Sequence, residues 1–123
     1  MKQTILDTNF ILICIKQKID FFEELGLEGI QIIIPKQVID EIKKIATSKQ
    51  KLKYRENAKL ALKLLEENKF KKIDLGKGHV DKRIIDYSKN NKNIVVATLD
   101  KELKNKIKNP KLVIRGKKKL EIV

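Results

Sequence analysis

The sequence contains little cysteine and few aromatic residues. Its 123 residues include one cysteine, no tryptophan, two tyrosines and four phenylalanines. The single cysteine, Cys14, excludes an intrachain disulfide and a cysteine-based metal site. Because Cys14 lies in the apolar run FILICI at residues 10–15, we expect it to be a buried hydrophobe. We expect Tyr54, Tyr87 and the phenylalanines to lie mostly in the core, so the sequence predicts no aromatic platform for stacking single-stranded bases.

Long apolar segments are also missing. No run approaches the roughly 20 apolar residues that a membrane-spanning helix needs, and the N-terminus lacks the basic and apolar pattern of a signal peptide. We therefore expect a cytoplasmic protein with no membrane partner. The length and the absence of linkers or repeats predict a single domain over residues 1–123.

Acidic residues are outnumbered by basic ones. Sixteen Asp and Glu stand against 29 Lys and Arg, which gives a formal net charge of +13. Such an excess attracts polyanions and releases their counterions on binding. Nucleic acid is the polyanion that this charge favours. An anionic membrane surface and a lysine-coated surface without a partner are the alternatives.

Short β-like runs alternate with helical patterns along the chain. Such alternation predicts an α/β fold, a three-layer α/β/α sandwich around a central, mainly parallel five-stranded sheet. The predicted strands cover residues 4–6, 30–34, 72–75, 94–97 and 112–114, and residues 120–123 could add a small terminal strand. The predicted helices cover residues 9–18, 21–25, 35–46, 54–68, 80–90 and 101–108.

Two aspartates follow predicted strands. Asp7 comes directly after the first strand, and Asp100 comes shortly after the strand at 94–97. Ligands of an open parallel sheet bind beyond the carboxyl ends of the strands, so both carboxylates are expected at the same edge. The alternative is that each aspartate only caps the helix that follows it.

Two further acids lie on predicted helices. Helical residues advance by about 100° each, which places Glu41 on the flank of an apolar stripe and Asp40 on the solvent side. In the helix that begins at Val80, Asp81 lies near the inner face and Asp86 points away. Asp81 could be explained by the helix dipole alone. A metal ion is the functional alternative.

Together these residues form a set of four converging carboxylates: Asp7, Glu41, Asp81 and Asp100. Converging anions repel one another unless a cation neutralises them, and oxygen ligands of this type suit hard divalent ions. Mg²⁺ or Mn²⁺ in such a cluster can activate water and stabilise charge developing on a phosphodiester. An acidic pocket within a basic surface therefore predicts metal-dependent chemistry on nucleic acid.

Four short segments resemble, in order, the motifs of the PIN-domain nucleases. They are LDTN at 6–9, VIDEI at 38–42, VDKRI at 80–84 and ATLDKEL at 97–103. The ending VIRGKK at 113–118 resembles an archaeal branch related to ribosomal-RNA-processing PIN proteins, and toxin-type PIN ribonucleases are similar as well. The resemblance covers nearly the whole chain.

Membership of this family implies a five-stranded parallel sheet, dependence on Mg²⁺ or Mn²⁺, and cleavage of single-stranded RNA by an endoribonuclease. The four acids then act as catalytic and metal-binding residues, and Asn9 and Thr98 match positions that support the metal ligands. Two positions depart from the pattern: Lys82 stands where the branch often has a second acid, and Leu99 where a polar residue is usual. We expect the lysines that cluster after the fourth motif to contact RNA phosphates: Lys101, Lys104, Lys117, Lys118 and Lys119.

Several alternatives stay open at this point. A non-catalytic RNA-binding or scaffold protein could use the same fold, because fold does not determine activity. A phosphoryl-transfer enzyme with Asp7 as nucleophile commonly needs a second aspartate where this chain has Asn9. Within the nuclease class, the chain could be the toxin of a toxin–antitoxin pair. Beyond RNA, the possible partners are a second copy of the chain, a ribosome-assembly factor or an antitoxin.

Overall fold

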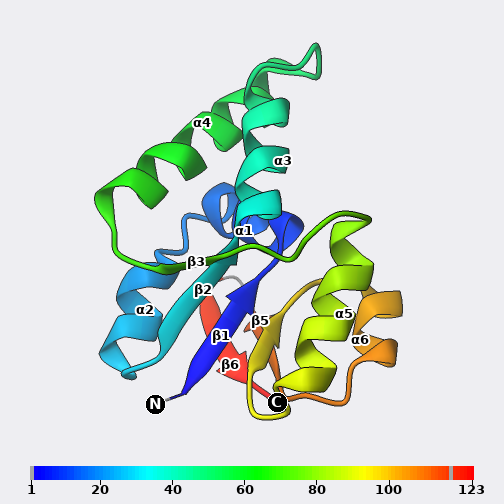
Figure 1. The fold of residues 1–123 in the computed structure, drawn as a ribbon. Coiled ribbons are helices and arrows are strands. Elements are labelled where there is room, and N and C mark those ends of the chain that lie inside the picture. The colour runs from blue at the N-terminus through cyan, green and yellow to red at the C-terminus, as the bar shows by residue number, and fades with distance from the viewer. Residues whose placement is uncertain (1, 117) are drawn as a thin grey trace.

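A computed structural model of the chain describes residues 2–116 and 118–123 (Figure 1). Strands and helices alternate along it, as predicted. The strands are β1 (Gln3–Leu6), β2 (Gln31–Pro35), β3 (Lys71–Ile73), β4 (Val95–Ala97), β5 (Lys111–Arg115) and β6 (Lys119–Ile122). The helices are α1 (Thr8–Lys16), α2 (Phe21–Leu27), α3 (Lys36–Ala46), α4 (Leu52–Glu67), α5 (Val80–Asn90) and α6 (Lys101–Lys106).

In the described residues, the strands form one six-stranded sheet in the order β3-β2-β1-β4-β5-β6. The pairs from β3 to β5 are parallel, and β6 pairs antiparallel with β5. The prediction of a mainly parallel sheet is therefore confirmed. Over the described residues the sheet has six strands rather than five, because the terminal segment that the sequence left open does form a strand. The terminal segment completes the sheet because the turn at Gly116, with a φ of 59°, lets the chain fold back on β5.

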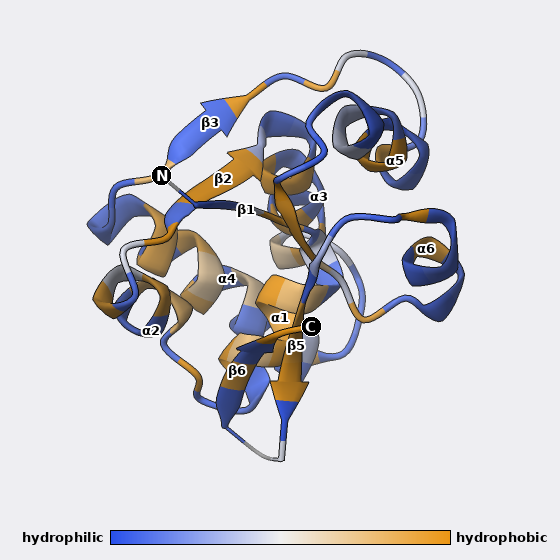
Figure 2. Ribbon diagram, turned by 90° about the horizontal axis from the view of Figure 1, so that it is seen from below, coloured by the Kyte–Doolittle hydropathy of each residue, from blue (hydrophilic) through white to orange (hydrophobic). Residues whose placement is uncertain are grey.

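Helices cover both faces of the sheet, which gives the predicted three layers (Figure 2). The side chains of β2 show the reason, because successive residues of a strand point to opposite faces. Ile32 and Ile34 join the core beneath α1, α2, α3 and α4, whereas Ile33 joins a second core with residues of α5 and α6. Central parallel strands are apolar on both faces for this reason.

The larger core contains Cys14, which is fully buried as predicted. Burial raises the pKa of the Cys14 thiol to about 12. Because the thiolate is the reactive form of cysteine, this side chain acts as a small hydrophobe.

Helices α3 and α4 form a hairpin that extends beyond the carboxyl ends of β1 and β2 (Figure 1). Helix α4 begins at Leu52 rather than at the predicted residue 54, because the Lys51 carbonyl already accepts the N–H groups of Tyr54 and Arg55. Helix α6 ends at Lys106 rather than at 108, since the backbone is extended at Ile107. Nowhere in residues 2–116 and 118–123 is a helix both long and apolar enough to cross a membrane.

Candidate functional site

The strand order reverses direction between β1 and β4. From β1 the chain adds β2 and β3 on one side, and it later adds β4 and β5 on the other. Crevices at the carboxyl ends of such neighbouring strands are the usual ligand sites of α/β sheets. Asp7 follows β1, and its backbone N–H donates to the carbonyl of Ala97 at the end of β4 over 3.2 Å. The topology therefore fixes Asp7 at this reversal point.

Asp7 is a buried carboxylate, with 6% of its surface exposed. Its Oδ1 caps α1 by accepting the N–H of Phe10 over 2.8 Å. Burial raises the pKa of Asp7 to about 6, although hydrogen bonds from the Thr98 side chain and the Phe10 N–H act to lower it. The negative charges of Asp81 and Asp100 add to the increase in pKa. Asp7 therefore caps α1 and also belongs to the acidic cluster. The cap does not remove the repulsion of Asp7 by Asp81 and Asp100.

Asp100 also caps a helix while belonging to the acidic cluster. Its Oδ1 caps α6 by accepting the N–H groups of Glu102 and Leu103 over 2.9 and 3.3 Å, so the cap uses only one carboxylate oxygen. The fully buried Thr98 holds the turn before α6, because its hydroxyl accepts the Asp100 N–H over 3.2 Å. Thr98 therefore supports two of the four acids, Asp7 through its side chain and Asp100 through the turn.

Glu41 and Asp81 approach Asp7 from two different helices. Glu41 lies half-buried on α3, where its Oε1 accepts a hydrogen bond from the Thr8 hydroxyl. Asp81 lies in the first turn of α5. Asp81 is exposed, although the helix geometry predicted a place near the inner face. Asp86, which was predicted to point away, is partly covered and lies 3.7 Å from Arg83. Asp40 is exposed, as predicted.

The loop before α5 determines where Asp81 lies. Gly76 and Gly78 have φ values of 87° and 113°, which residues other than glycine rarely adopt. A Cβ at Gly78 would also lie 3.2 Å from Nε of Arg83. These two glycines let the chain turn from the edge strand β3 to the start of α5, beside the carboxyl end of the sheet.

A cavity of about 370 Å³ joins these elements. Its lining includes three of the four predicted acids, namely Asp7, Glu41 and Asp81. Asp100 lines the neighbouring pocket instead, and Asn9 lines both. Across the described ranges, no three His, Cys, Asp or Glu side chains are gathered closely enough to form a complete ion site. The fold thus brings the acids to one edge but not into one coordination sphere.

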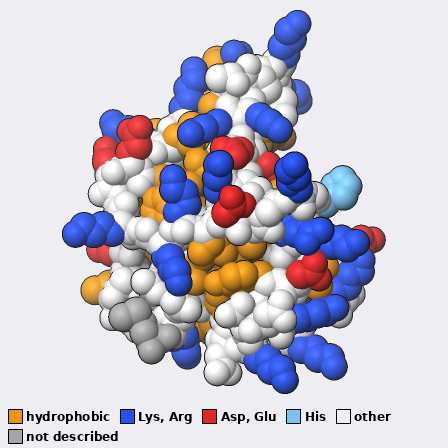
Figure 3. Space-filling model, viewed as in Figure 1, with side chains coloured by type: hydrophobic (Ala, Val, Ile, Leu, Met, Phe, Trp, Pro, Cys, Tyr) orange, Lys and Arg blue, Asp and Glu red, His pale blue; other side chains and the backbone are white. Residues whose placement is uncertain are grey.

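The chemistry of this cavity fits a divalent cation. A buried carboxylate beside further acids is stabilised when a positive charge replaces the missing solvation. Its donors are carboxylate, hydroxyl and amide oxygens, which are ligands that hard cations prefer. Figure 3 shows acidic side chains below the α3–α4 hairpin, surrounded by lysine and arginine side chains. The site therefore combines an acidic centre with basic surroundings.

Two residues of this cavity were missed in the sequence. Thr8 holds Glu41, and Lys44 lines the cavity on the same side of α3 as Glu41. The spacing of three residues between Glu41 and Lys44 could have revealed Lys44, because helical residues three apart are neighbours. Thr8 lies in the LDTN motif at 6–9, but no feature of the sequence links its hydroxyl to Glu41.

The predicted RNA-contacting lysines lie in two places. Lys101 and Lys104 lie on α6, directly after Asp100, with Lys101 exposed and Lys104 half-buried. Lys118 and Lys119 are exposed at the turn between β5 and β6 and at the start of β6. Lys117 lies outside the described residues. The five lysines are therefore not all carried by one element.

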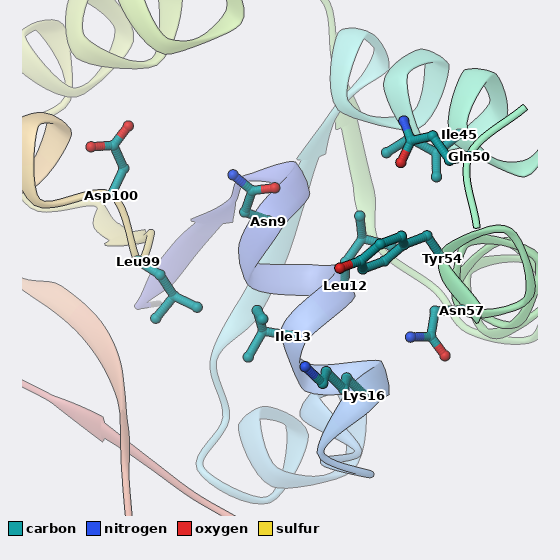
Figure 4. Close-up of a pocket in the computed structure, with 10 residues that line it drawn as sticks. All are labelled: Asn9, Leu12, Ile13, Lys16, Ile45, Gln50, Tyr54, Asn57, Leu99 and Asp100. Carbon is teal, nitrogen blue, oxygen red and sulfur yellow. The ribbon is translucent and has the colours of Figure 1, made fainter. Parts of the chain in front are cut away.

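A larger pocket of about 680 Å³ adjoins the acidic cavity (Figure 4). It lies between α1 and the start of α4, with Leu99 and Asp100 on its other side. Tyr54 lines this pocket and is 51% exposed, so its predicted place in the core is wrong. Leu99, where the family pattern is usually polar, also lines it.

Comparisons with known proteins agree with this arrangement. A family model described as a PIN-like domain matches residues 4–117. Ribonuclease VapC4 from Methanocaldococcus jannaschii is 34% identical over 128 residues, which cover 99% of this chain and 97% of that relative. Among solved structures, the PIN domain endonuclease Utp24 has 29% identity and a TM-score of 0.76, over 98% of this chain and 90% of that one.

A more distant likeness concerns the fold alone. VapBC2 from Rickettsia felis, solved with a DNA fragment from its promoter, has 17% identity and a TM-score of 0.59 over 89% of this chain and 98% of that one. The resemblance read from the four motifs is confirmed by the family match and by the relative that spans almost the full length. The chain belongs to the PIN-like domain family.

Proposed function

We propose that this chain is a metal-dependent endoribonuclease that hydrolyses phosphodiester bonds in single-stranded RNA. The observation that carries the proposal is the buried Asp7 carboxylate at the β1–β4 reversal, which faces a cavity shared with Glu41 and Asp81. The relatives support it, since one is named a ribonuclease and another is described as an endonuclease. The net charge of +13 favours a polyanionic substrate.

We propose that the ion is Mg²⁺ or Mn²⁺ and that it bridges at least two of the four acids, Asp7, Glu41, Asp81 and Asp100. A bound ion of this kind supplies an activated water and neutralises charge on the phosphate. Thr8 positions Glu41 through its hydroxyl, and Thr98 positions Asp7 and Asp100. Asn9 lies between the acidic cavity and the larger pocket, where its amide can orient the strand that crosses them.

Lys44 contributes a positive charge to the same cavity. An ammonium group there attracts a phosphate that carboxylates alone would repel. Lys101 and Lys104 extend this positive charge along α6 and would contact the strand beyond the cut. The cytoplasm, where RNA is available, is the location that we propose.

The test is an assay of defined single-stranded RNAs with Mn²⁺, with Mg²⁺ and with a chelator, followed by sequencing of the products. We expect discrete cuts with either ion and none with the chelator. Protein carrying Asp7→Asn, prepared in the same way, controls for contaminating nucleases. RNA that is bound but stays intact with both ions would contradict the proposal and favour a non-catalytic RNA-binding role.

An RNA-processing enzyme and a toxin would use the same site. The gene beside this one separates them, because a small antitoxin gene is expected only for a toxin. Mass measurement of the purified protein would then show whether it binds such a partner or a second copy of itself.

A further inference from the structure

The larger pocket has features that the acidic cavity lacks. It encloses about 680 Å³, within the range of small-molecule sites. Its walls are aliphatic side chains of α1 and α3, including Leu12, Ile13 and Ile45. Because Asn9 and Ile45 line both this pocket and the acidic cavity, the two spaces are neighbours.

Tyr54 gives this pocket an aromatic wall. The residue lies in the first turn of α4, and its side chain reaches toward α1 in Figure 4. With 51% of the residue exposed, the side chain is accessible to a ligand in the pocket. An exposed aromatic ring over an apolar floor is the arrangement on which nucleobases stack.

Side-chain amides lie around the ring. Gln50 precedes α4, and Asn57 lies one helical turn after Tyr54, half-buried. An amide carries both donors and an acceptor, so it can hydrogen-bond to the edge of a base. Lys16, at the end of α1, adds a positive charge at the same pocket.

We propose that this pocket binds one nucleobase of the RNA, beside the nucleotide whose phosphate is cut. Tyr54 stacks on the base, Gln50 and Asn57 bond to its edge, and Lys16 contacts the adjoining phosphate. The proposal rests on the proposed function and adds a specificity site to it. The alternative occupant is an apolar peptide segment. The amides, the lysine and the overall positive charge favour a nucleotide over such a segment.

The consequence is a sequence preference next to the cut. A strand that passes from the pocket to the acidic cavity crosses Asn9, so the base held by Tyr54 sets which phosphate meets Asp7. The enzyme then selects cutting sites by one flanking base rather than by a long sequence.

The first test titrates isotope-labelled protein with the four ribonucleoside monophosphates and follows amide chemical shifts without added metal. We expect shifts around residues 50–57 that differ between the four bases. Tyr54→Ala should weaken this binding about tenfold, because a stacked base contributes about one to three kcal/mol. Tyr54→Phe keeps the ring and should stay close to wild type. Leu60→Ala, an exposed position on the same helix, is the control.

The second test sequences the cuts made in a randomised RNA pool. Tyr54→Ala should raise KM and flatten the preference for the flanking base, and Asn57→Ala should change which base is preferred. Identical cut sites and rates in wild type and Tyr54→Ala would overturn the proposal, as would monophosphates that shift no resonance in the pocket. A peptide that fills the pocket and is not displaced by any monophosphate would overturn it too.

The two failures are distinguishable. If wild type does not cut RNA at all, the proposed function fails, and the monophosphate titration still decides whether the pocket binds bases. If wild type cuts but Tyr54→Ala cuts identically, only the base site is wrong.

Discussion

The acidic cavity and the Tyr54 pocket are adjacent but are built differently. The cavity is centred on Asp7, a buried residue that a strand end and a hydrogen bond to β4 hold in place. The pocket depends on side chains at the start of α4, which are exposed or half-buried. Asp7 and Asp100 thus follow strands of the sheet, whereas the recognition side chains of Tyr54 and Asn57 lie on α4. Substitutions at the start of α4 can therefore alter recognition without changing Asp7.

Removing one negative charge from the acidic cavity should have the largest effect. Asp7→Asn keeps the shape and the cap but loses the anion. Because a catalytic ion supplies several kcal/mol of transition-state stabilisation, we expect cleavage to fall by roughly a hundredfold or more. RNA binding should hold or tighten, since repulsion of phosphate is reduced. Initial rates and filter binding measure the two effects.

Asp40→Asn is the matched control, because Asp40 is exposed on the same helix as Glu41. Asp86→Asn is less suitable, since Asp86 lies near Arg83. If all three variants cleave as well as wild type does, the acids are not catalytic and the cavity has another role.

The second prediction concerns the stability of the cavity without metal. The pKa of Asp7 is about 6 in the folded protein, against 3.8 for an aspartate side chain in water, so the folded protein binds this proton more tightly than the unfolded chain does. Its contribution to stability is fully present below about pH 4 and is lost as the pH rises through about 6. The loss amounts to at most about 3 kcal/mol. Urea denaturation of chelator-treated protein from pH 4 to 7.5 measures it.

Asp7→Asn removes the titrating carboxyl group, so the free energy of unfolding should depend less on pH. The variant should therefore be more stable than wild type at pH 7.5. Adding Mn²⁺ at that pH should raise the melting temperature of wild type more than that of the variant. A wild-type stability that rises from pH 5 to 7 in the absence of metal would contradict the assignment, because other groups would then dominate.

Most of the fold could be predicted from the sequence because its signals are local. The isoleucines of β2 mark a central strand buried on both faces, and the helix over 80–90 has the predicted bounds. The sixth strand was left open, since only its pairing with β5 decides whether that segment is extended. Asp7 and Asp100 could likewise be predicted, because the carboxyl ends of parallel strands lie at one edge of the sheet.

The Tyr54 pocket could not be predicted in this way. Tyrosine is often found in a core, so the sequence favoured burial of Tyr54. The packing of α4 against α1 and α3 leaves the residue exposed instead. The exposure of Asp81 was not predicted either. Asp81 lines the cavity with Asp7, but it is exposed rather than near a buried face, because the glycine loop places the first turn of α5 beside the end of the sheet.

A third prediction uses that loop. Gly78→Ala places a Cβ at a φ of 113°, 3.2 Å from Nε of Arg83. We expect a loss of about 1–2 kcal/mol in unfolding free energy and a displaced Asp81. Cleavage should fall several-fold while the preference for the flanking base stays the same. Gly26→Ala is the control, because Gly26 lies in α2 with no atom within 4 Å of the added Cβ. If Gly78→Ala is as stable as wild type, a Cβ at this position causes no strain and the prediction is wrong.

The smallest expected effect concerns the path of the RNA away from both sites. If the strand runs over α6, Lys101→Gln should reduce the salt dependence of binding by about 0.7 units of log–log slope, the value for one single-strand phosphate contact. Cut sites should not change, because a phosphate contact carries no base information. Lys63→Gln, on the exposed side of α4, is the control for a general loss of charge.

The same measurement on Lys118→Gln decides whether the β5–β6 turn contacts the strand, since a turn that stays free of RNA leaves the slope at its wild-type value. If Lys101→Gln and Lys63→Gln change the slope equally, the positive charge acts as a diffuse field, and only the Tyr54 pocket and the acidic cavity position the RNA.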